Sequence, residues 1–200
     1  RMFVINRAMT DDMEGGTAWL KNQIIKLGHL FNKNSMSGSK KNIANHYDLG
    51  NDLFKLFLDD NMMYSSAVFT SEKESLEVAS DRKLKIICEK LDLKPTDKVI
   101  EIGTGRGGFA IYAAQHYGCH ITTTTISDEQ HAYATVRIAQ LGLTEQITLL
   151  KQDYRVLEGC FDKLVSIEMI EAVGHQYLDC YTQKINDLLK PDGLALIQAI

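Results

Sequence analysis

The feature that most constrains the fold is the alternation of short apolar runs with helical patterns from residue 98 onward. β-Branched and aliphatic residues dominate these runs, which makes each of them typical of a strand. We predict strands at 98–103, 120–125, 146–153, 162–169 and 194–200, with helices between them and a turn at Pro191–Gly193. Strands that alternate with helices form a mainly parallel sheet with helices on both faces, which binds ligands at the carboxyl ends of its strands. The sequence therefore predicts an α/β fold with its site at that edge.

A glycine-rich loop follows the first of these strands. Gly103, Gly105 and Gly108 have the spacing of a dinucleotide fingerprint, which by itself is a weak indication of a nucleotide site. A dinucleotide site also needs an acid at the end of the second strand, about 20 residues further on, to bind the ribose. The stretch TTTTIS (122–127) contains no acid. The loop therefore predicts a nucleotide ligand other than NAD.

Glu101 stands two residues before the first glycine of this loop. A carboxylate there would repel a diphosphate, but it suits a ligand with an ammonium or sulfonium group. Asp153, at the end of the third strand, is placed to meet an adenine amino group. A cationic adenosine ligand without phosphate, S-adenosylmethionine, fits these residues better than NAD. Two simpler interpretations stay open at this point: Glu101 as a solvated acid at a strand end, and the glycines as only a tight turn.

Composition excludes several classes of protein. Apolar residues make up 44% and charged residues 24% of the chain, as in soluble globular proteins. The net charge of −4 argues against a general nucleic-acid binder, and no apolar run approaches the roughly 20 residues of a membrane span. The four cysteines are widely spread and form no metal-binding pattern. We therefore predict a cytoplasmic protein without a metal site, whose thiols are reduced and mostly buried.

The first half of the chain has a different pattern. Apolar residues at helical spacing predict helices over 1–34, 43–60 and 72–93, with a polar loop at 32–42. We expect 1–93 to be a helical segment that covers the active site and 94–200 to be the cofactor-binding domain. We also expect the natural protein to begin before Arg1 and to continue past Ile200 with further strands of the sheet.

Several motifs in order give the chain a family resemblance. Over most of residues 40–200 it resembles the cyclopropane-fatty-acyl-phospholipid synthase family, which includes the mycolic acid cyclopropane synthases and related fatty-acyl methyltransferases. HYDLGN and QDYR are the more diagnostic motifs, because generic methyltransferases need neither. The resemblance implies the Rossmann-like fold of class I S-adenosylmethionine-dependent methyltransferases. The stretches that carry it are HYDLGNDLFKLFLDDNMMYSSAVF (46–69), EIGTGRGG (101–108), TISDEQ (125–130), KQDYRVL (151–157) and EMIEAVGHQY (168–177).

The resemblance implies transfer of a methyl group from S-adenosylmethionine to the double bond of an unsaturated acyl chain. The alkene attacks the methyl group, a carbocation forms, and a base, typically a bound bicarbonate ion, removes a proton to give a cyclopropane. Other proton losses give a methylene or, after reduction, a methyl branch. The implied substrate is a phospholipid acyl chain, so we expect a protein peripheral to the inner face of the membrane. No nucleic-acid partner is expected, and a homodimer is left open.

The resemblance also implies roles for particular residues, position by position. Cofactor contacts would come from the methionine-side pair Tyr64 and Ser65, from Glu101, Gly103 and Gly105, from the ribose-side pair Thr125 and Gln130, and from the adenine-side pair Asp153 and Tyr154. The base site would be formed by the Glu171 carboxylate, the backbones of Ser66 and Ile200, and Gln198.

Two of these positions depart from many relatives, which have cysteine at Ser66 and histidine at Gln198. Glutamine can hydrogen-bond bicarbonate but cannot carry a proton, so the departure bears on the proton route and on the product. Glu168 lies at the same edge as Glu171 and competes with it for the assignment.

Simpler interpretations stay open for several of these residues. Tyr64 would otherwise be a core tyrosine, and Glu171 an acid of a first helical turn. His46 and His175 are candidate bases, although a lone histidine is more often structural. A methyltransferase for a small polar molecule and a non-catalytic binding module are the competing functions.

Overall fold

The computed structural model describes residues 51–200, which lie within one compact unit, Lys40–Ile200. The predicted helix over 1–34, the loop at 32–42 and the first part of the helix over 43–60 lie outside the described residues. Residues 51–93 belong to the same compact unit as the sheet that follows them. Among the described residues, no helix is both long and apolar enough to cross a membrane.

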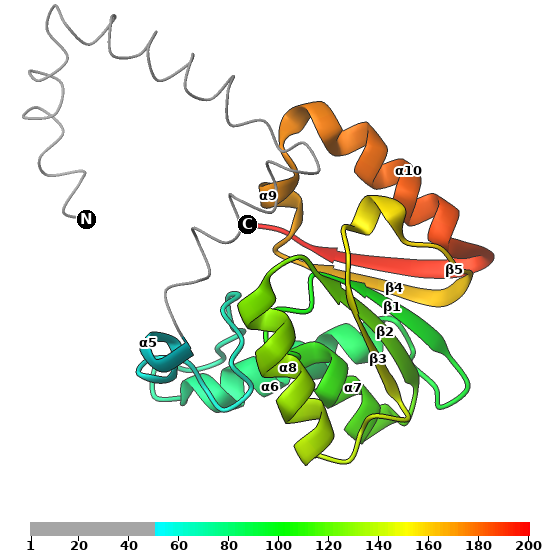
Figure 1. The fold of residues 1–200 in the computed structure, drawn as a ribbon. Coiled ribbons are helices and arrows are strands. Elements are labelled where there is room, and N and C mark those ends of the chain that lie inside the picture. The colour runs from blue at the N-terminus through cyan, green and yellow to red at the C-terminus, as the bar shows by residue number, and fades with distance from the viewer. Residues whose placement is uncertain (1–50) are drawn as a thin grey trace, which may run out of the picture. The chain divides into compact units, whose positions relative to one another are not determined.

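Within residues 51–200, five parallel strands form one sheet in the order β3-β2-β1-β4-β5 (Figure 1). The order reverses between β1 and β4, and ligands of such sheets bind at this switch point, outside the carboxyl ends of the strands. The predicted parallel sheet is confirmed. Its strands are β1 (Lys98–Ile102), β2 (His120–Thr125), β3 (Ile147–Lys151), β4 (Phe161–Ile167) and β5 (Leu189–Gln198).

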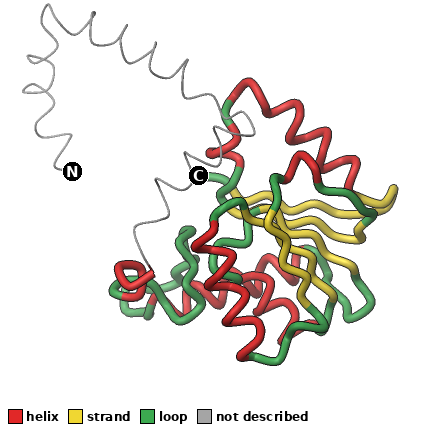
Figure 2. Tube along the Cα trace, viewed as in Figure 1, coloured by secondary structure: helices red, strands yellow, loops and turns green. Residues whose placement is uncertain are grey.

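Helices cover both faces of the sheet, as predicted (Figures 1 and 2). On one face Val99 and Ile121 pack with apolar residues of α6, α7 and α8. On the other face Ile100 and Ile102 pack with α10 and η1. The helices are α5 (Asn51–Lys55), α6 (Leu76–Lys90), α7 (Gly108–Tyr117), α8 (Asp128–Gln140), α9 (Ile170–Val173) and α10 (Leu178–Leu188), with the 3₁₀ turns η1 (Tyr154–Val156) and η2 (His175–Tyr177).

Helix boundaries follow the local capping chemistry. Ser127 caps α8 as predicted, because its side chain accepts a hydrogen bond from the backbone N–H of Gln130 at 3.1 Å. Ser75 caps α6 in the same way, so the helix predicted over 72–93 is shorter at both ends. The helix predicted over 43–60 extends no further than Lys55. After this helix the chain turns through the polar residues 59–61. The next residue, Met62, has a φ of 54°.

The last strand corrects the predicted turn at Pro191–Gly193. β5 begins at Leu189 and bulges, because Phe161 pairs with Leu189 while Lys163 already pairs with Leu194. Proline lacks the N–H that a regular ladder needs, and a bulge removes that need. The three turn-forming residues therefore interrupt the strand without ending it.

The cysteine prediction is half right. All four cysteines are free thiols. Cys88 and Cys119 are buried, but Cys160 and Cys180 are exposed. The description of the thiols as mostly buried is therefore wrong for two of the four.

Candidate functional site

The glycine loop lies at the switch point, between the ends of β1 and β4. The backbone N–H groups of Gly103 and Thr104 donate to the carbonyl of Thr124 at 3.2 and 2.9 Å, which ties the loop to the end of β2. Gly103 has a φ of 100°, a conformation that side chains rarely adopt. The loop ends at Gly107, which caps α7 without a side chain, so the first N–H groups of α7 point toward this edge.

Glu101 lies beneath this loop and is only 2% exposed. Its carboxylate accepts a hydrogen bond of 2.6 Å from the hydroxyl of Thr123, its partner across the β1–β2 ladder. Burial raises the pKa of Glu101 from 4.5 to about 8, against the lowering effect of this hydrogen bond. The open interpretation of Glu101 as a solvated acid is therefore wrong. It is a buried carboxyl group that a cationic group would stabilise in its ionised form.

The segment 54–64 packs over the glycine loop. The guanidinium of Arg106, inside the loop, lies 3.9 Å from the centre of the Phe54 ring. Tyr64 packs edge-on against the same ring at 5.3 Å between centroids. A Cβ atom at Gly108 would stand 2.9 Å from the carbonyl oxygen of Asn61, so only glycine fits at the start of α7. The cofactor edge of the sheet is thus covered by chain that precedes the sheet in the sequence.

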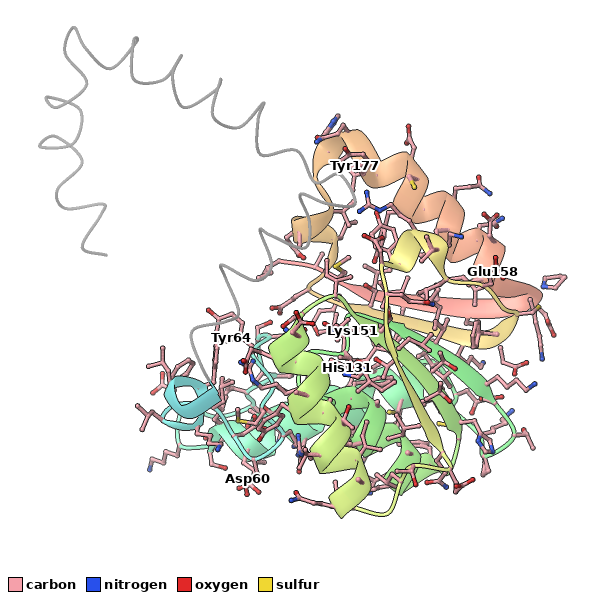
Figure 3. All side chains as sticks on the ribbon, viewed as in Figure 1. Asp60, Tyr64, His131, Lys151, Glu158 and Tyr177 are labelled. Carbon is pink, nitrogen blue, oxygen red and sulfur yellow. The ribbon has the colours of Figure 1, made fainter. Side chains whose placement is uncertain are left out.

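Tyr64 and Ser65, the expected methionine-side contacts, differ in their surroundings. Tyr64 is 52% exposed and lies on the segment that precedes the sheet (Figure 3). The hydroxyl and the carbonyl of Ser65 accept hydrogen bonds from Lys83 of α6. Lys83 is 2% exposed, and burial lowers its pKa from 10.5 to about 8 against the favourable charges of Glu168 and Asp59.

The sequence did not single out Lys83. A signal was available, because the buried positions Ala79, Lys83 and Ile87 follow each other at a spacing of four on one face of α6. A lysine on such an apolar face is a candidate for a site residue.

Thr125 and Gln130, the expected ribose-side pair, are brought together. The hydroxyl of Thr125 donates to Oε1 of Gln130 at 2.7 Å and accepts from the N–H of Ser127 at 3.1 Å. Both side chains are buried. The turn between β2 and α8 therefore presents a fixed polar group at the ligand edge.

Asp153 and Tyr154, the expected adenine-side pair, are already engaged with neighbours. The carboxylate of Asp153 accepts hydrogen bonds from Nε and Nη2 of Arg155 at 2.8 and 2.6 Å. Although burial raises the pKa of Asp153, hydrogen bonds from Arg155 hold it below its ordinary value. Tyr154 is buried, with its ring against Tyr181 at 5.5 Å. Arg155 is thus a further residue of the expected adenine side. The adenine contacts of Asp153 and Tyr154 stay a prediction.

Glu168 accepts hydrogen bonds from two of the expected base-site residues. Its Oε1 accepts hydrogen bonds from the backbone N–H of Ser66 at 2.8 Å, the hydroxyl of Ser66 at 2.7 Å and Nε2 of Gln198 at 2.7 Å. Gln198 also donates to the hydroxyl of Ser66 at 3.1 Å. The side chains of Ser66 and Gln198 thus both bind Glu168, and the assignment of the base site to Glu171 or Glu168 stays a prediction.

Glu171 and Ile200 form a separate contact at the same edge. The backbone N–H of Ile200 donates to Oε1 of Glu171 at 2.7 Å. Glu171 lies in the first turn of the short helix α9 and is exposed. Among the other candidates, His175 is exposed in η2, and His46 lies outside the described residues.

A bicarbonate ion does not fit the donors that the resemblance assigns to it. The N–H and hydroxyl of Ser66 and the amide of Gln198 already bind the carboxylate of Glu168. The N–H of Ile200 already binds Glu171. An added anion would compete with two carboxylates for these donors and be repelled by both.

Known proteins match this chain over most of its length. The family described as Mycolic acid cyclopropane synthetase matches residues 34–200. The chain is 45% identical over 155 residues to the cyclopropane-fatty-acyl-phospholipid synthase of Escherichia coli (strain K12), covering 78% of this chain and 39% of that protein. It is 39% identical over 173 residues to the tuberculostearic acid methyltransferase UfaA1 of Mycobacterium tuberculosis, covering 83% and 40% respectively.

A solved structure is similar in fold and in sequence. The mycolic acid cyclopropane synthase CmaA1, complexed with SAH and CTAB, superposes with a TM-score of 0.75 at 28% identity. The superposition covers 79% of this chain and 55% of that one. The chain spans about two fifths of the length of the two curated relatives above, 39% and 40%. The predicted class I methyltransferase fold is confirmed.

Proposed function

Because the chain belongs to the mycolic acid cyclopropane synthetase family, we propose that its protein is an S-adenosylmethionine-dependent methyltransferase. It adds a methyl group to the double bond of an unsaturated fatty-acyl chain. The observation that carries this proposal is the family match over 34–200, which spans both the glycine loop and the segment that packs over it. The fold alone would support any class I methyltransferase, but the match to fatty-acyl methyltransferases selects this substrate class.

The cofactor is proposed from the chemistry around the glycine loop. When bound, S-adenosylmethionine supplies an electrophilic methyl group on a sulfonium. Buried Glu101 favours a cationic ligand, and the exposed ring of Tyr64 can shield a sulfonium through a cation–π contact. The Thr125–Gln130 pair offers polar groups where a ribose would lie. The SAH bound in the solved CmaA1 structure supports the same choice.

The substrate side is proposed from apolar side chains that precede the sheet. An apolar acyl chain needs a surface that leaves water when the two associate. Such a surface would let the protein work peripherally at the inner face of the cytoplasmic membrane, on phospholipid acyl chains. The exposed apolar residues between positions 53 and 78, which precede the sheet, are Leu53, Leu56, Phe57, Tyr64, Val68, Phe69, Leu76 and Val78.

The product is proposed to be a cyclopropane fatty acid. Methyl transfer leaves a carbocation on the acyl chain, and loss of a proton from the added methyl group closes the ring. Loss of a different proton would give a methylene and, after reduction, a methyl branch. Bicarbonate is left out of this proposal, because Ser66 and Gln198 are already bound to Glu168.

The proposal is tested by lipid mass spectrometry of cells with and without expression of the full-length protein. Expression should convert unsaturated acyl chains into chains heavier by one CH₂ group. In purified protein, Glu171→Gln should leave the affinity for S-adenosylhomocysteine within about twofold and lower turnover by about 100-fold or more, because its carboxylate stabilises developing positive charge. Glu158→Gln is the matched control, since Glu158 is exposed and precedes β4 at the opposite edge (Figure 3). Unchanged lipids on expression would refute the proposal.

A further inference from the structure

Glu168 is held as a hydrogen-bond acceptor by residues far apart in the sequence. Three donors meet on its Oε1: the N–H and the hydroxyl of Ser66, and the side-chain amide of Gln198. Within residues 51–200, no donor reaches its second oxygen, Oε2. One oxygen is therefore fixed in place while the other keeps its lone pairs for a further partner.

The backbone at Glu168 is also special. Glu168 has a φ of 48°, in the left-handed region that non-glycine residues seldom adopt. Its N–H donates to the carbonyl of Gln198 at 2.8 Å, which extends the β4–β5 pairing by one residue. Strain of this kind persists where surrounding contacts impose it, and it clusters at functional sites. Here it turns the carboxylate out of the strand at the point where β4 ends.

This position adjoins the cofactor loop. Glu168 directly follows β4, and β4 pairs with β1, from which the glycine loop emerges. A Cβ atom added at Gly103 would lie 3.7 Å from the Cβ of Met169. The carboxylate is thus anchored one residue away from a contact with the loop that is proposed to bind the methyl donor.

A buried lysine interacts with this carboxylate. Burial lowers the pKa of Lys83 from 10.5 to about 8, and the charge of Glu168 opposes that lowering. Lys83 is therefore mostly protonated at pH 7 and attracts the carboxylate of Glu168. A base that removes a proton must be ionised before the step.

We propose that Glu168 is the catalytic base and takes the place that bicarbonate has in relatives. This inference rests on the proposed function. Ser66 and Gln198 stand where many relatives have cysteine and histidine, and in this chain both bind Glu168. A glutamine that cannot relay a proton is consistent with a base that belongs to the chain itself.

The electrons balance in this step. The alkene π electrons form a bond to the methyl carbon while its bond to sulfur breaks, and the sulfur keeps that pair as a neutral thioether. The neighbouring acyl carbon is left as a cation. Glu168 takes a proton from the added methyl group, whose C–H electrons close the three-membered ring. The protonated Glu168 then returns its proton to water.

The test uses purified full-length protein, labelled S-adenosylmethionine and vesicles of unsaturated phospholipid. In buffer stripped of carbon dioxide and bicarbonate, the wild type should keep its rate within about twofold. Glu168→Gln should lower turnover by about 100-fold or more, the usual contribution of a general base, while Glu158→Gln should match the wild type. Binding of S-adenosylhomocysteine by each variant shows that it is folded.

Glu168→Ala provides a second measurement, because it empties the place of the carboxylate but keeps the donors of Ser66 and Gln198. Added formate or bicarbonate should restore its turnover by about tenfold or more, and neither should affect the wild type. A wild type that stops without bicarbonate, or a Glu168→Gln variant of normal turnover, would overturn the assignment. Absence of label in lipid with the wild type would instead overturn the proposed function itself.

Discussion

Replacing Glu101 by glutamine should remove a proton-linked step from cofactor binding. The carboxyl group of Glu101 is 2% exposed and has a pKa of about 8, so most of it is protonated at pH 7. A ligand with an ammonium group binds the ionised form best, and ionising the group at one pH unit below its pKa costs about 1.4 kcal/mol, a factor of about ten in affinity. At pH 6 the same arithmetic gives about 2.7 kcal/mol.

The variant should therefore differ from the wild type most at high pH. A hydrogen bond to a charged group contributes about 1.5–3 kcal/mol, and the wild type gains all of it only above pH 8. Near pH 6 the cost of ionisation offsets that gain, so the wild type and Glu101→Gln should bind with similar affinity. At pH 8.5 the wild type should bind about 10- to 100-fold more tightly. The hydrogen bond from Thr123 is kept in the variant, because a glutamine oxygen accepts it equally.

The same shift predicts how stability depends on pH. The folded-state pKa of Glu101 is raised above its ordinary value of 4.5, so the folded protein holds this proton more tightly than the unfolded chain does. Its contribution to stability is complete below about pH 4.5 and is lost as the pH rises through about 8. Glu101→Gln should remove that loss across this window.

Isothermal titration with S-adenosylhomocysteine, which carries the same ammonium group, measures the binding affinity and the proton release of both proteins between pH 6 and 8.5. Titrations at pH 7 in two buffers of different ionisation enthalpy should show release of close to one proton per site from the wild type. The variant should release none. An affinity of the wild type that does not change with pH, or equal proton release from both proteins, would contradict the assignment of Glu101.

Two further substitutions test the packing of the site. Gly108→Ala should lower the melting temperature and the affinity for S-adenosylhomocysteine, because its methyl group would collide with Met63; overpacking costs about 1–3 kcal/mol and outweighs the gain of up to about 1 kcal/mol in helix propensity. An unchanged melting curve would show that the covering segment moves aside freely. Tyr181→Phe removes the buried hydrogen bond of 2.7 Å to Ser166 and should lower the free energy of unfolding by about 1 kcal/mol, measured by urea denaturation, with cofactor affinity unaltered. A loss of unfolding free energy above about 3 kcal/mol would indicate that the packing around Tyr181 also depends on this hydroxyl.

Much of the fold was predictable because its signals are local. Alternating apolar runs located each strand that the structure describes in residues 51–200, and Ser127 marked the start of α8 through its own side chain. The start of β5 was missed, because Pro191 normally argues against a strand and only the bulge beside Asp162 accommodates it. The cofactor edge was equally predictable, since parallel strands place their carboxyl ends together.

The base site could be predicted only as a list of positions, because its contacts depend on register. Ile167 pairs with Gln198 across β4 and β5, and this pairing places Gln198 beside Glu168. Ser66 reaches the same carboxylate from 102 residues away. The sequence showed Ser66 and Gln198 as separate departures from relatives, and only Gln198 bore on the expected proton route. In the folded chain they are donors to one acceptor, so the three residues act as a unit and the effects of replacing Ser66 and Gln198 should not add.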